Sequence, residues 1–222
     1  MKLTLLSYAV GAGTPVYPGD PVAVVEERCS IDGDGYAAYV LHLSNHCGTH
    51  VDGPAHFNPM APPLSALEPE AFVFAHPLLL DIPKGADELI GPDEIDDQVG
   101  NRRPDLLLIR TGFSALRATD PTQYASHCPG LSAAAAQFIV EKASSVRAIA
   151  VDTISAGPPA APEESFAAHR YLCGVGRTDG RFVLIYEDAR LDHLAVSPVR
   201  VWGLPLMVEG LDSAPVTMIA EI

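Results

Sequence analysis

Four side chains of metal-binding type lie within eleven residues of one another: His46, His50, Asp52 and His56. Imidazole nitrogens and carboxylate oxygens both suit zinc and manganese, and three imidazoles with one carboxylate form an ordinary ligand set for either ion. A lone histidine is usually a surface residue or a hydrogen-bonded core residue. This density, in a chain with 8 histidines, instead indicates a metal site or a catalytic site.

Glycine and proline in the same segment argue against a helix. A continuous helix through all four side chains is disfavoured by Gly48, Gly53 and Pro54. The segment therefore differs from the helical HExxH arrangement of metalloproteases. We expect a strand that runs into a tight loop, because such a loop can direct several side chains at one point.

The spacing of these side chains predicts two roles. On an extended backbone His50 and Asp52 share a face, and His46 has the same parity, so all three could converge on one ion. His56 has this parity too, but it follows the turn at Gly53 and Pro54. It could lie beside the ion without binding it, which is the position that a general base needs.

The same segment resembles the signature of a known family. The pattern His-x-Gly-Thr-His-x-Asp-x-Pro-x-His is typical of the cyclase-like metal-dependent hydrolases, which include bacterial kynurenine formamidase and isatin hydrolase. The sequence matches it at every fixed position: His46, Gly48, Thr49, His50, Asp52, Pro54 and His56. Further similarity at residues 129–132, 151–155, 204–206 and 212–216 extends the resemblance over nearly the whole chain. We therefore expect one domain over residues 1–222.

The resemblance implies further site residues outside this segment. The family supplies a histidine and a glutamate from the C-terminal half, and His169 and Glu187 match those positions. Two divalent ions, zinc or manganese, would then share Asp52. The separation of eighteen residues is longer than is usual in the formamidases, and residues 176–181 look like an inserted hairpin. Tyr17 stands where the family has an aromatic residue that helps to bind the substrate; kynurenine formamidases typically have Trp there, and a surface aromatic is the alternative.

Composition narrows the class of protein. With 222 residues, 48% hydrophobic and 19% charged, the chain can build a full core. A net charge of -14 argues against a nucleic-acid partner, because binding phosphates needs a basic surface. The four cysteines form no CxxC pair, which argues against a thiolate metal site and a disulfide framework. No apolar run approaches membrane-spanning length, so we expect a cytoplasmic protein.

Periodicity and turn residues predict alternating strands and helices. A hairpin turn is expected at residues 31–36, a covering loop at 59–69, and a helix N-cap at Ser132. The fold implied by the resemblance is a compact α/β domain with mixed β-sheets and flanking helices, of the swivelling β/β/α type, assembled as a homodimer or homotetramer. The expected strands cover residues 3–10, 22–29, 36–44, 77–82, 106–110, 148–152, 182–187, 202–208 and 216–222, and the expected helices cover residues 92–99, 133–142 and 163–172.

The predicted function is metal-dependent hydrolysis of an amide, formamide or lactam bond in a small aromatic molecule. A divalent ion would acidify a water molecule for attack at neutral pH, and His56 would take its proton and return it to the leaving nitrogen. A polyketide-type cyclase that uses the same site is one alternative. A metal-binding scaffold without catalysis is another, although it would not need His56. No GxSxG, GxGxxG or Walker motif is present, so a serine hydrolase and a nucleotide-binding protein are unsupported.

Overall fold

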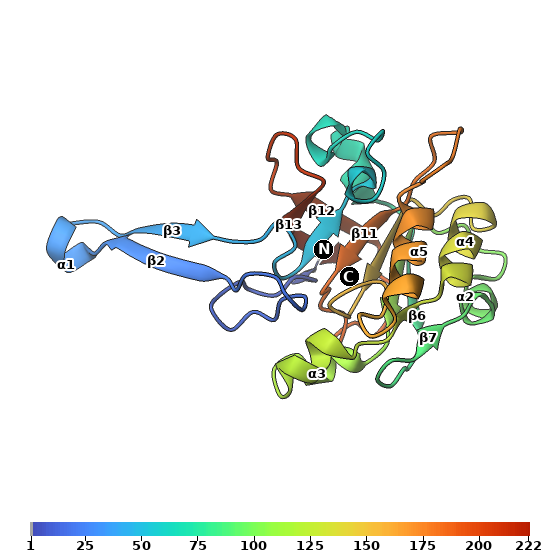
Figure 1. The fold of residues 1–222 in the computed structure, drawn as a ribbon, viewed down its shortest axis with the longest axis horizontal. Helices are drawn as coiled ribbons and strands as arrows, with labels where there is room; N and C mark the ends of the chain where they lie inside the picture. The colour runs from blue at the N-terminus through green and yellow to red at the C-terminus, as the bar shows by residue number, and fades with distance from the viewer. Residues whose placement is uncertain (1) are drawn as a thin grey trace.

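A mixed β-sheet forms the centre of the protein, which the computed structural model describes from residue 2 to residue 222. Nine strands of this described part belong to the sheet (Figure 1). In order across the sheet they are β5 (Val73–Phe74), β12 (Arg200–Pro205), β13 (Ser213–Glu221), β4 (His50–Asp52), β11 (Leu184–Glu187), β10 (Ala148–Val151), β8 (Leu106–Arg110) and β6 (Pro77–Asp81), and β1 (Leu3–Leu5) pairs with β13.

The direction of strand pairing changes at β4. On one side, β6, β8, β10 and β11 run parallel to one another. On the other side, β4, β13, β12 and β5 pair antiparallel, and β4 is also antiparallel to β11. The short strand that carries His50 and Asp52 therefore lies where the two halves of the sheet meet.

Helices cover one face of the parallel half (Figure 1). These are α2 (Pro92–Val99), α4 (Ala133–Glu141) and α5 (Pro162–Leu172), whose apolar side chains pack against alternate residues of β6, β8, β10 and β11. As predicted, Ser132 caps α4, since its hydroxyl accepts a hydrogen bond from the Ala135 amide at 3.1 Å. No helix within residues 2–222 is long and apolar enough to cross a bilayer.

The opposite face of the sheet builds a second apolar core. Leu106 and Leu108 of β8 point into it, whereas Leu107 and Ile109 point toward the helices. Both faces of β8 are thus buried, as its continuous apolar sequence predicts. The 3-10 helices η2 (Leu64–Ala66) and η3 (Pro69–Phe72) cover this second face. The first lies within the predicted covering loop, and the second begins at the last residue of that loop. The compact α/β domain with a mixed sheet is confirmed.

Several smaller elements complete the fold. Two short strands, β7 (Leu89–Ile90) and β9 (Gly130–Leu131), pair parallel to each other. The helix α3 (Pro121–Ser126) and the 3-10 helix η4 (Phe113–Leu116) were not predicted from the sequence. The strand predicted at residues 3–10 ends at Leu5, because the Tyr8 amide donates to the Thr49 hydroxyl at 3.1 Å and not to a neighbouring strand.

One hairpin stands away from the rest of the molecule (Figure 1). It consists of β2 (Val24–Cys29) and β3 (Ala38–His42), which form a two-stranded sheet of their own. We call residues 22–44 the arm. Its tip is not the predicted hairpin turn but a short helix, α1 (Ile31–Asp34). That helix forms because the Ser30 hydroxyl caps its start and Gly35, with φ 80°, ends it.

Candidate metal centre

The register of β4 places its polar side chains beside those of two other strands. His50 lies opposite Glu187 of β11, and Asp52 lies opposite Ser213 of β13. Because residues two apart share a face of a strand, His50 and Asp52 point into the same space, as predicted. Pairing between strands that are distant in the sequence thus brings Glu187, the glutamate predicted from the family resemblance, next to His50 and Asp52.

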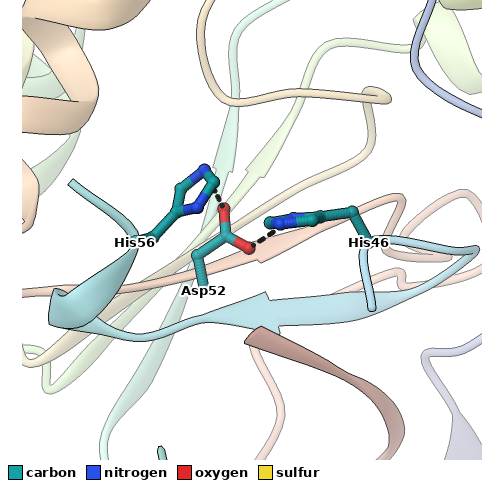
Figure 2. Close-up of side chains that lie close together, drawn as sticks. All are labelled: His46, Asp52 and His56. Carbon is teal, nitrogen blue, oxygen red and sulfur yellow. Dashed lines mark ion pairs between the residues drawn. The ribbon is translucent and has the colours of Figure 1, made fainter. Parts of the chain in front are cut away.

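A tight turn after β4 brings His56 back toward Asp52. The turn requires Gly53, because a Cβ there would lie 2.7 Å from Leu64 Cδ2 and 3.0 Å from the Asp212 carbonyl oxygen. The 3-10 helix η1 (Pro54–His56) then points the His56 ring inward. Figure 2 shows His46 and His56 on either side of Asp52, each directed at one of its carboxylate oxygens.

Asp52 is the common neighbour of three histidines. Its Oδ1 lies 3.1 Å from His46 Nδ1 and 3.4 Å from His50 Nε2, and its Oδ2 lies 3.9 Å from His56 Nε2. Ligand-type atoms gather in two groups that share Asp52, one with His46 and His56 and one with His50 and Glu187. This differs from the predicted grouping of His46 with His50, and it places His56 within reach of an ion.

Glu187 lies between His50 of β4 and His169 of α5. Its Oε2 lies 3.3 Å from His50 Nε2, and its Oε1 lies 3.2 Å from His169 Nε2. All three side chains are buried. Residues 176–181, which the sequence analysis interprets as an inserted hairpin, do not separate His169 from Glu187.

Backbone carbonyls orient the two most deeply buried imidazoles. His50 Nδ1 lies 2.8 Å from the Gly48 oxygen, and His169 Nδ1 lies 2.7 Å from the Ser165 oxygen. Each Nδ1–H therefore donates to a carbonyl, and each Nε2 faces the carboxylates, where it can ligate a cation once it is neutral. Metal-binding histidines typically have their second nitrogen fixed in this way.

The spacing and the hydrogen-bond status of these atoms fit a divalent cation. His50 Nε2 and both oxygens of Asp52 are buried and have no hydrogen-bond partner. Buried polar atoms are rarely left without one, so their convergence indicates that something else satisfies them. A tetrahedral ion with bonds of about 2.0–2.2 Å holds its ligand atoms about 3.3–3.6 Å apart, and the separations from His50 Nε2 to Asp52 and Glu187 match that spacing.

Protons on the histidines balance the carboxylates when no cation is bound. Burial lowers the pKa of His46, but the neighbouring carboxylates of Asp212 and Asp52 outweigh it and raise this pKa to about 10. The pKa of His50 is likewise raised by Asp52 and Glu187 against the effect of burial. Burial raises the pKa of Glu187, but His169 and His50 hold it well below its usual range. A bound ion must displace such protons, since imidazole ligates only when it is neutral.

Asp212 is the neighbour of this cluster that sequence reasoning missed. It lies in the loop between β12 and β13, and its Oδ2 lies 2.7 Å from His56 Nδ1. Asn45 Nδ2 donates to its other oxygen at 3.0 Å. Residues 212–216 resemble the closing segment of the family, but no local pattern in the sequence links this aspartate to a histidine 156 positions earlier.

A second missed feature fixes the end of β11. Asp188, which follows Glu187, is fully buried and receives hydrogen bonds from Arg117 Nε at 2.7 Å and Arg117 Nη2 at 2.6 Å. The Tyr124 hydroxyl donates to the same carboxylate at 2.6 Å, and the Thr49 hydroxyl donates to the Asp188 carbonyl at 2.7 Å. These bonds hold the backbone beside Glu187 and tie it to the residue before His50.

The cluster opens into a cavity of about 310 Å³. Tyr17 lines it, so the structure places this predicted substrate-binding residue next to the histidines. Phe57, Phe166 and Ile154 add an apolar wall, and the Phe57 ring stacks on His169 with centroids 5.1 Å apart. Asp20 also lines the cavity, but no Lys or Arg of residues 2–222 does. The other histidines, which the sequence assigned to structural roles, are His42, His76, His127 and His193, and none of them lines it.

Sequence comparison identifies the family. The model of the Cyclase family matches residues 4–158, which is more than half of the chain. The chain belongs to the Cyclase family. A kynurenine formamidase from Delftia acidovorans is 29% identical over 217 residues, covering 97% of this chain and 95% of that protein. A kynurenine formamidase from Paracidovorax citrulli is 26% identical and covers 95% of this chain and 92% of that protein.

Solved structures show the same fold. Isatin hydrolase A from Labrenzia aggregata, bound to benzyl benzoate, superposes with a TM-score of 0.84 and 22% identity, over 99% of this chain and 93% of that one. Isatin hydrolase A from Ralstonia solanacearum gives a TM-score of 0.84 at 21% identity, over 99% and 91% of the two chains. The mixed sheet and its flanking helices are therefore shared with these hydrolases.

Proposed function

We propose that this protein is a metal-dependent hydrolase that cleaves the C–N bond of an amide, formamide or lactam in a small aromatic molecule. One observation carries the proposal: His50 Nε2 and both Asp52 oxygens are buried, converge, and have no hydrogen-bond partner. The similarity to kynurenine formamidases over nearly the whole chain supports the reaction type. Those relatives are named for hydrolysis of a formamide.

Five residues hold the metal in this proposal. They are His46, His50, Asp52, His169 and Glu187, with zinc or manganese as the ion. Two ions per chain would share Asp52, because ligand-type atoms gather on both sides of that carboxylate, His46 with His56 on one side and His50 with Glu187 on the other. His56 is the one member of these groups that we assign to proton transfer. Strand β11 and the loop between β12 and β13 lie beyond the residues that the family model matches, yet they contribute Glu187 and Asp212 to the same cluster. We therefore treat residues 1–222 as one catalytic domain.

His56 is the proposed general base. When bound, the divalent ions make a water molecule acidic near neutral pH and polarise the substrate carbonyl. Hydrogen bonding of His56 Nδ1 to Asp212 leaves its Nε2 free to accept the proton of the attacking water. The same nitrogen then returns the proton to the leaving amine nitrogen, which completes the C–N cleavage. The partial exposure of His56 on the cavity wall suits this exchange.

The cavity favours a neutral, flat substrate. Tyr17, Phe57 and Phe166 can contact an aromatic ring, and the described lining has no Lys or Arg to pair with a substrate carboxylate. The carbonyl would face the histidines and the ring would face the aromatic wall. This arrangement is consistent with isatin-like lactams and aryl formamides, which combine a small ring system with one reactive amide.

Metal analysis combined with a substrate screen tests the proposal. The purified protein should contain one or two equivalents of zinc or manganese and should hydrolyse one of N-formylkynurenine, isatin or a bicyclic lactam. Chelation should abolish the activity, and the added ion should restore it. Metal-free protein with chelator-resistant activity would refute the metal mechanism. Bound metal with ring closure of a polyketide-type substrate and no hydrolysis would establish the cyclase alternative.

The proposal also covers the location and the assembly of the protein. We expect a cytoplasmic enzyme with a small-molecule substrate as its functional partner. We also expect a homodimer or homotetramer, the assembly that the family resemblance implies. Size-exclusion chromatography with light scattering on the full chain measures the assembly directly.

A further inference from the structure

Asp20 is a charged residue of the cavity wall that takes no part in the metal centre. Its carboxylate belongs to neither group of ligand-type atoms around Asp52. Within residues 2–222 this carboxylate forms no hydrogen bond and no ion pair, although the backbone amide of Asp20 does form a hydrogen bond. An ionised carboxylate only accepts hydrogen bonds. The cavity wall therefore presents an acceptor that the protein itself leaves without a donor.

A tight turn places Asp20 beside Tyr17. The Asp20 amide donates to the Tyr17 carbonyl oxygen at 2.9 Å, which closes a four-residue turn. Pro18 fits the second position of such a turn, and Gly19, with φ 99°, fits the third, where a positive φ favours glycine. Both residues at the tip are exposed, whereas Tyr17 and Asp20 are partly buried and line the cavity. The turn thus presents an aromatic ring and a carboxylate to the same substrate.

The negative charge of Asp20 acts on neighbouring groups of the cavity. Burial raises the pKa of Tyr17, and the charges of Glu187 and Asp20 raise it further. Burial also raises the pKa of Cys47, and the charges of Asp188 and Asp20 add to that effect. No Lys or Arg of residues 2–222 lines the cavity to offset the charge of Asp20. The Tyr17 hydroxyl therefore keeps its proton at neutral pH, and the wall beside it is negative.

A carboxylate in this position selects a substrate by the groups that the substrate can donate. A hydrogen bond to an ionised acceptor is stronger than one between neutral groups. A site built to accept a hydrogen bond from a substrate N–H or O–H discriminates against the analogue that lacks this group, because the acceptor is then left unpaired. Since Asp20 lies outside the metal centre, the donor belongs on the part of the ring away from the reacting amide.

We propose that Asp20 determines substrate specificity by accepting a hydrogen bond from an amino or hydroxyl group on the aromatic ring of the substrate, meta or para to the reacting amide. The inference rests on the proposed function, which supplies the ring and directs its carbonyl toward the histidines. Tyr17 contacts the ring, and Asp20 binds the donor. Because Asp20 takes no part in bond cleavage, its loss should raise KM and leave kcat almost unchanged.

Kinetics with matched aryl formamides test the proposal. Aminoformanilides carry the donor, and methylformanilides are analogues of similar size without it. The ratio of their kcat/KM values is compared between the wild type and Asp20→Ala, so that the different reactivities of the two amides cancel. In Asp20→Ala this ratio should fall about 10-fold or more at the meta or para position, through KM. An unchanged ratio at every ring position, or a fall at the ortho position alone, would overturn the proposal.

Two further variants separate the charge of Asp20 from its size and from the charge of the whole chain. Asp20→Asn keeps the size and one acceptor oxygen but removes the charge, so it should retain part of the preference for the amino group. Asp97→Ala removes a carboxylate from an exposed position of α2 outside the cavity and should leave the ratio unchanged. All three variants should keep the metal content of the wild type. An equal fall of the ratio in Asp97→Ala would assign the effect to net charge and overturn the proposal.

Binding measurements separate this inference from the proposed function. Aminobenzamides and methylbenzamides present the same two ring substituents, and titration calorimetry on the metal-loaded protein gives their dissociation constants. If no formanilide is hydrolysed, but aminobenzamides bind more tightly and Asp20→Ala removes the difference, the reaction is wrong and the role of Asp20 stands. If formanilides are hydrolysed and Asp20→Ala changes neither the kinetic ratio nor the binding ratio, the reaction stands and the role of Asp20 is wrong. A protein that neither hydrolyses the formanilides nor binds the benzamides would overturn both.

Discussion

The two sides of the Asp52 carboxylate have similar ligand atoms in different surroundings. On one side, His50 and His169 are 2% and 4% exposed, and backbone carbonyls fix both rings. On the other side, the His46 and His56 side chains are 21% and 24% exposed and contact the side chains of Asp212 and Ser213. We call these the enclosed side and the open side.

This difference separates holding an ion from exchanging a proton. A fully buried imidazole whose second nitrogen is fixed by a carbonyl has few other conformations, so it suits a permanent ligand. A partly exposed imidazole beside a carboxylate can receive a proton from water in the cavity and release it again. The enclosed side is therefore expected to determine metal affinity, and the open side to determine turnover.

The largest expected effect comes from the residue that both sides share. Asp52→Asn replaces a carboxylate oxygen in each group with an amide group and removes a negative charge. We expect loss of bound metal from both groups and a decrease in activity of at least about 10³-fold, beyond the 10–100-fold typical of residues that only support a ligand. Metal analysis and kinetics on the same preparation measure both. Retention of two ions in this variant would contradict the shared role of Asp52.

Paired histidine variants test the comparison directly. His50→Ala, on the enclosed side, should lose both metal and activity. His56→Ala, on the open side, should keep the metal and lose turnover by about 10²-fold or more, as expected for a general base. Equal loss of metal from the two variants would show that His56 is a ligand, a role that its distance from Asp52 also permits.

The parts of the site and fold that depend on local signals could be predicted from the sequence. Residues 46–56 were readable because the ligands are local and Gly53 and Pro54 restrict the backbone between them. The helix after Ser132 and the buried strand at residues 106–110 were readable for a similar reason, since a cap and a continuous apolar run are local signals.

Contacts between distant segments could not be read from the sequence. Glu187 reaches His50 only through the register of β4 with β11, and family resemblance, not a local pattern, drew attention to it. Asp212 reaches His56 through the loop between β12 and β13. The turn at residues 31–36 and its flanking segments predicted the two strands of the arm, but such local signals do not specify whether a hairpin joins the main sheet or leaves it.

A smaller effect is expected from Asp212, whose Oδ2 lies 2.7 Å from His56 Nδ1 and farther, at 3.6 Å, from His46 Nε2. Asp212→Asn should decrease kcat by about 10–100-fold, with little change in KM or metal content, because the ring of His56 loses its charged partner. The double variant Asp212→Asn with His56→Ala separates positioning from general destabilisation. If Asp212 acts through His56, the asparagine should add almost nothing once His56 is absent. Fully additive effects would assign Asp212 a different role.

The smallest expected effect is on the stability of the metal-free protein. The pKa of His46 is raised from 6.5 to about 10, so its stabilising contribution is complete below about pH 6.5 and is lost as the pH rises toward 10. The pKa of Glu187 is lowered, so its contribution is present above about pH 4.5 and is lost on acidification. The stability of the metal-free protein should therefore be greatest between about pH 4.5 and about pH 6.5.

Thermal unfolding with and without the ion measures this dependence. From pH 6.5 to pH 10 the chelated protein should lose stability, on the order of 1–3 kcal/mol, as the proton that pairs His46 with Asp52 and Asp212 dissociates. Zinc or manganese should stabilise the protein more strongly as the pH rises, because the ion replaces these protons. His46→Gln should flatten the pH dependence of the chelated protein. An unchanged slope in this variant would show that the open side does not hold the proton.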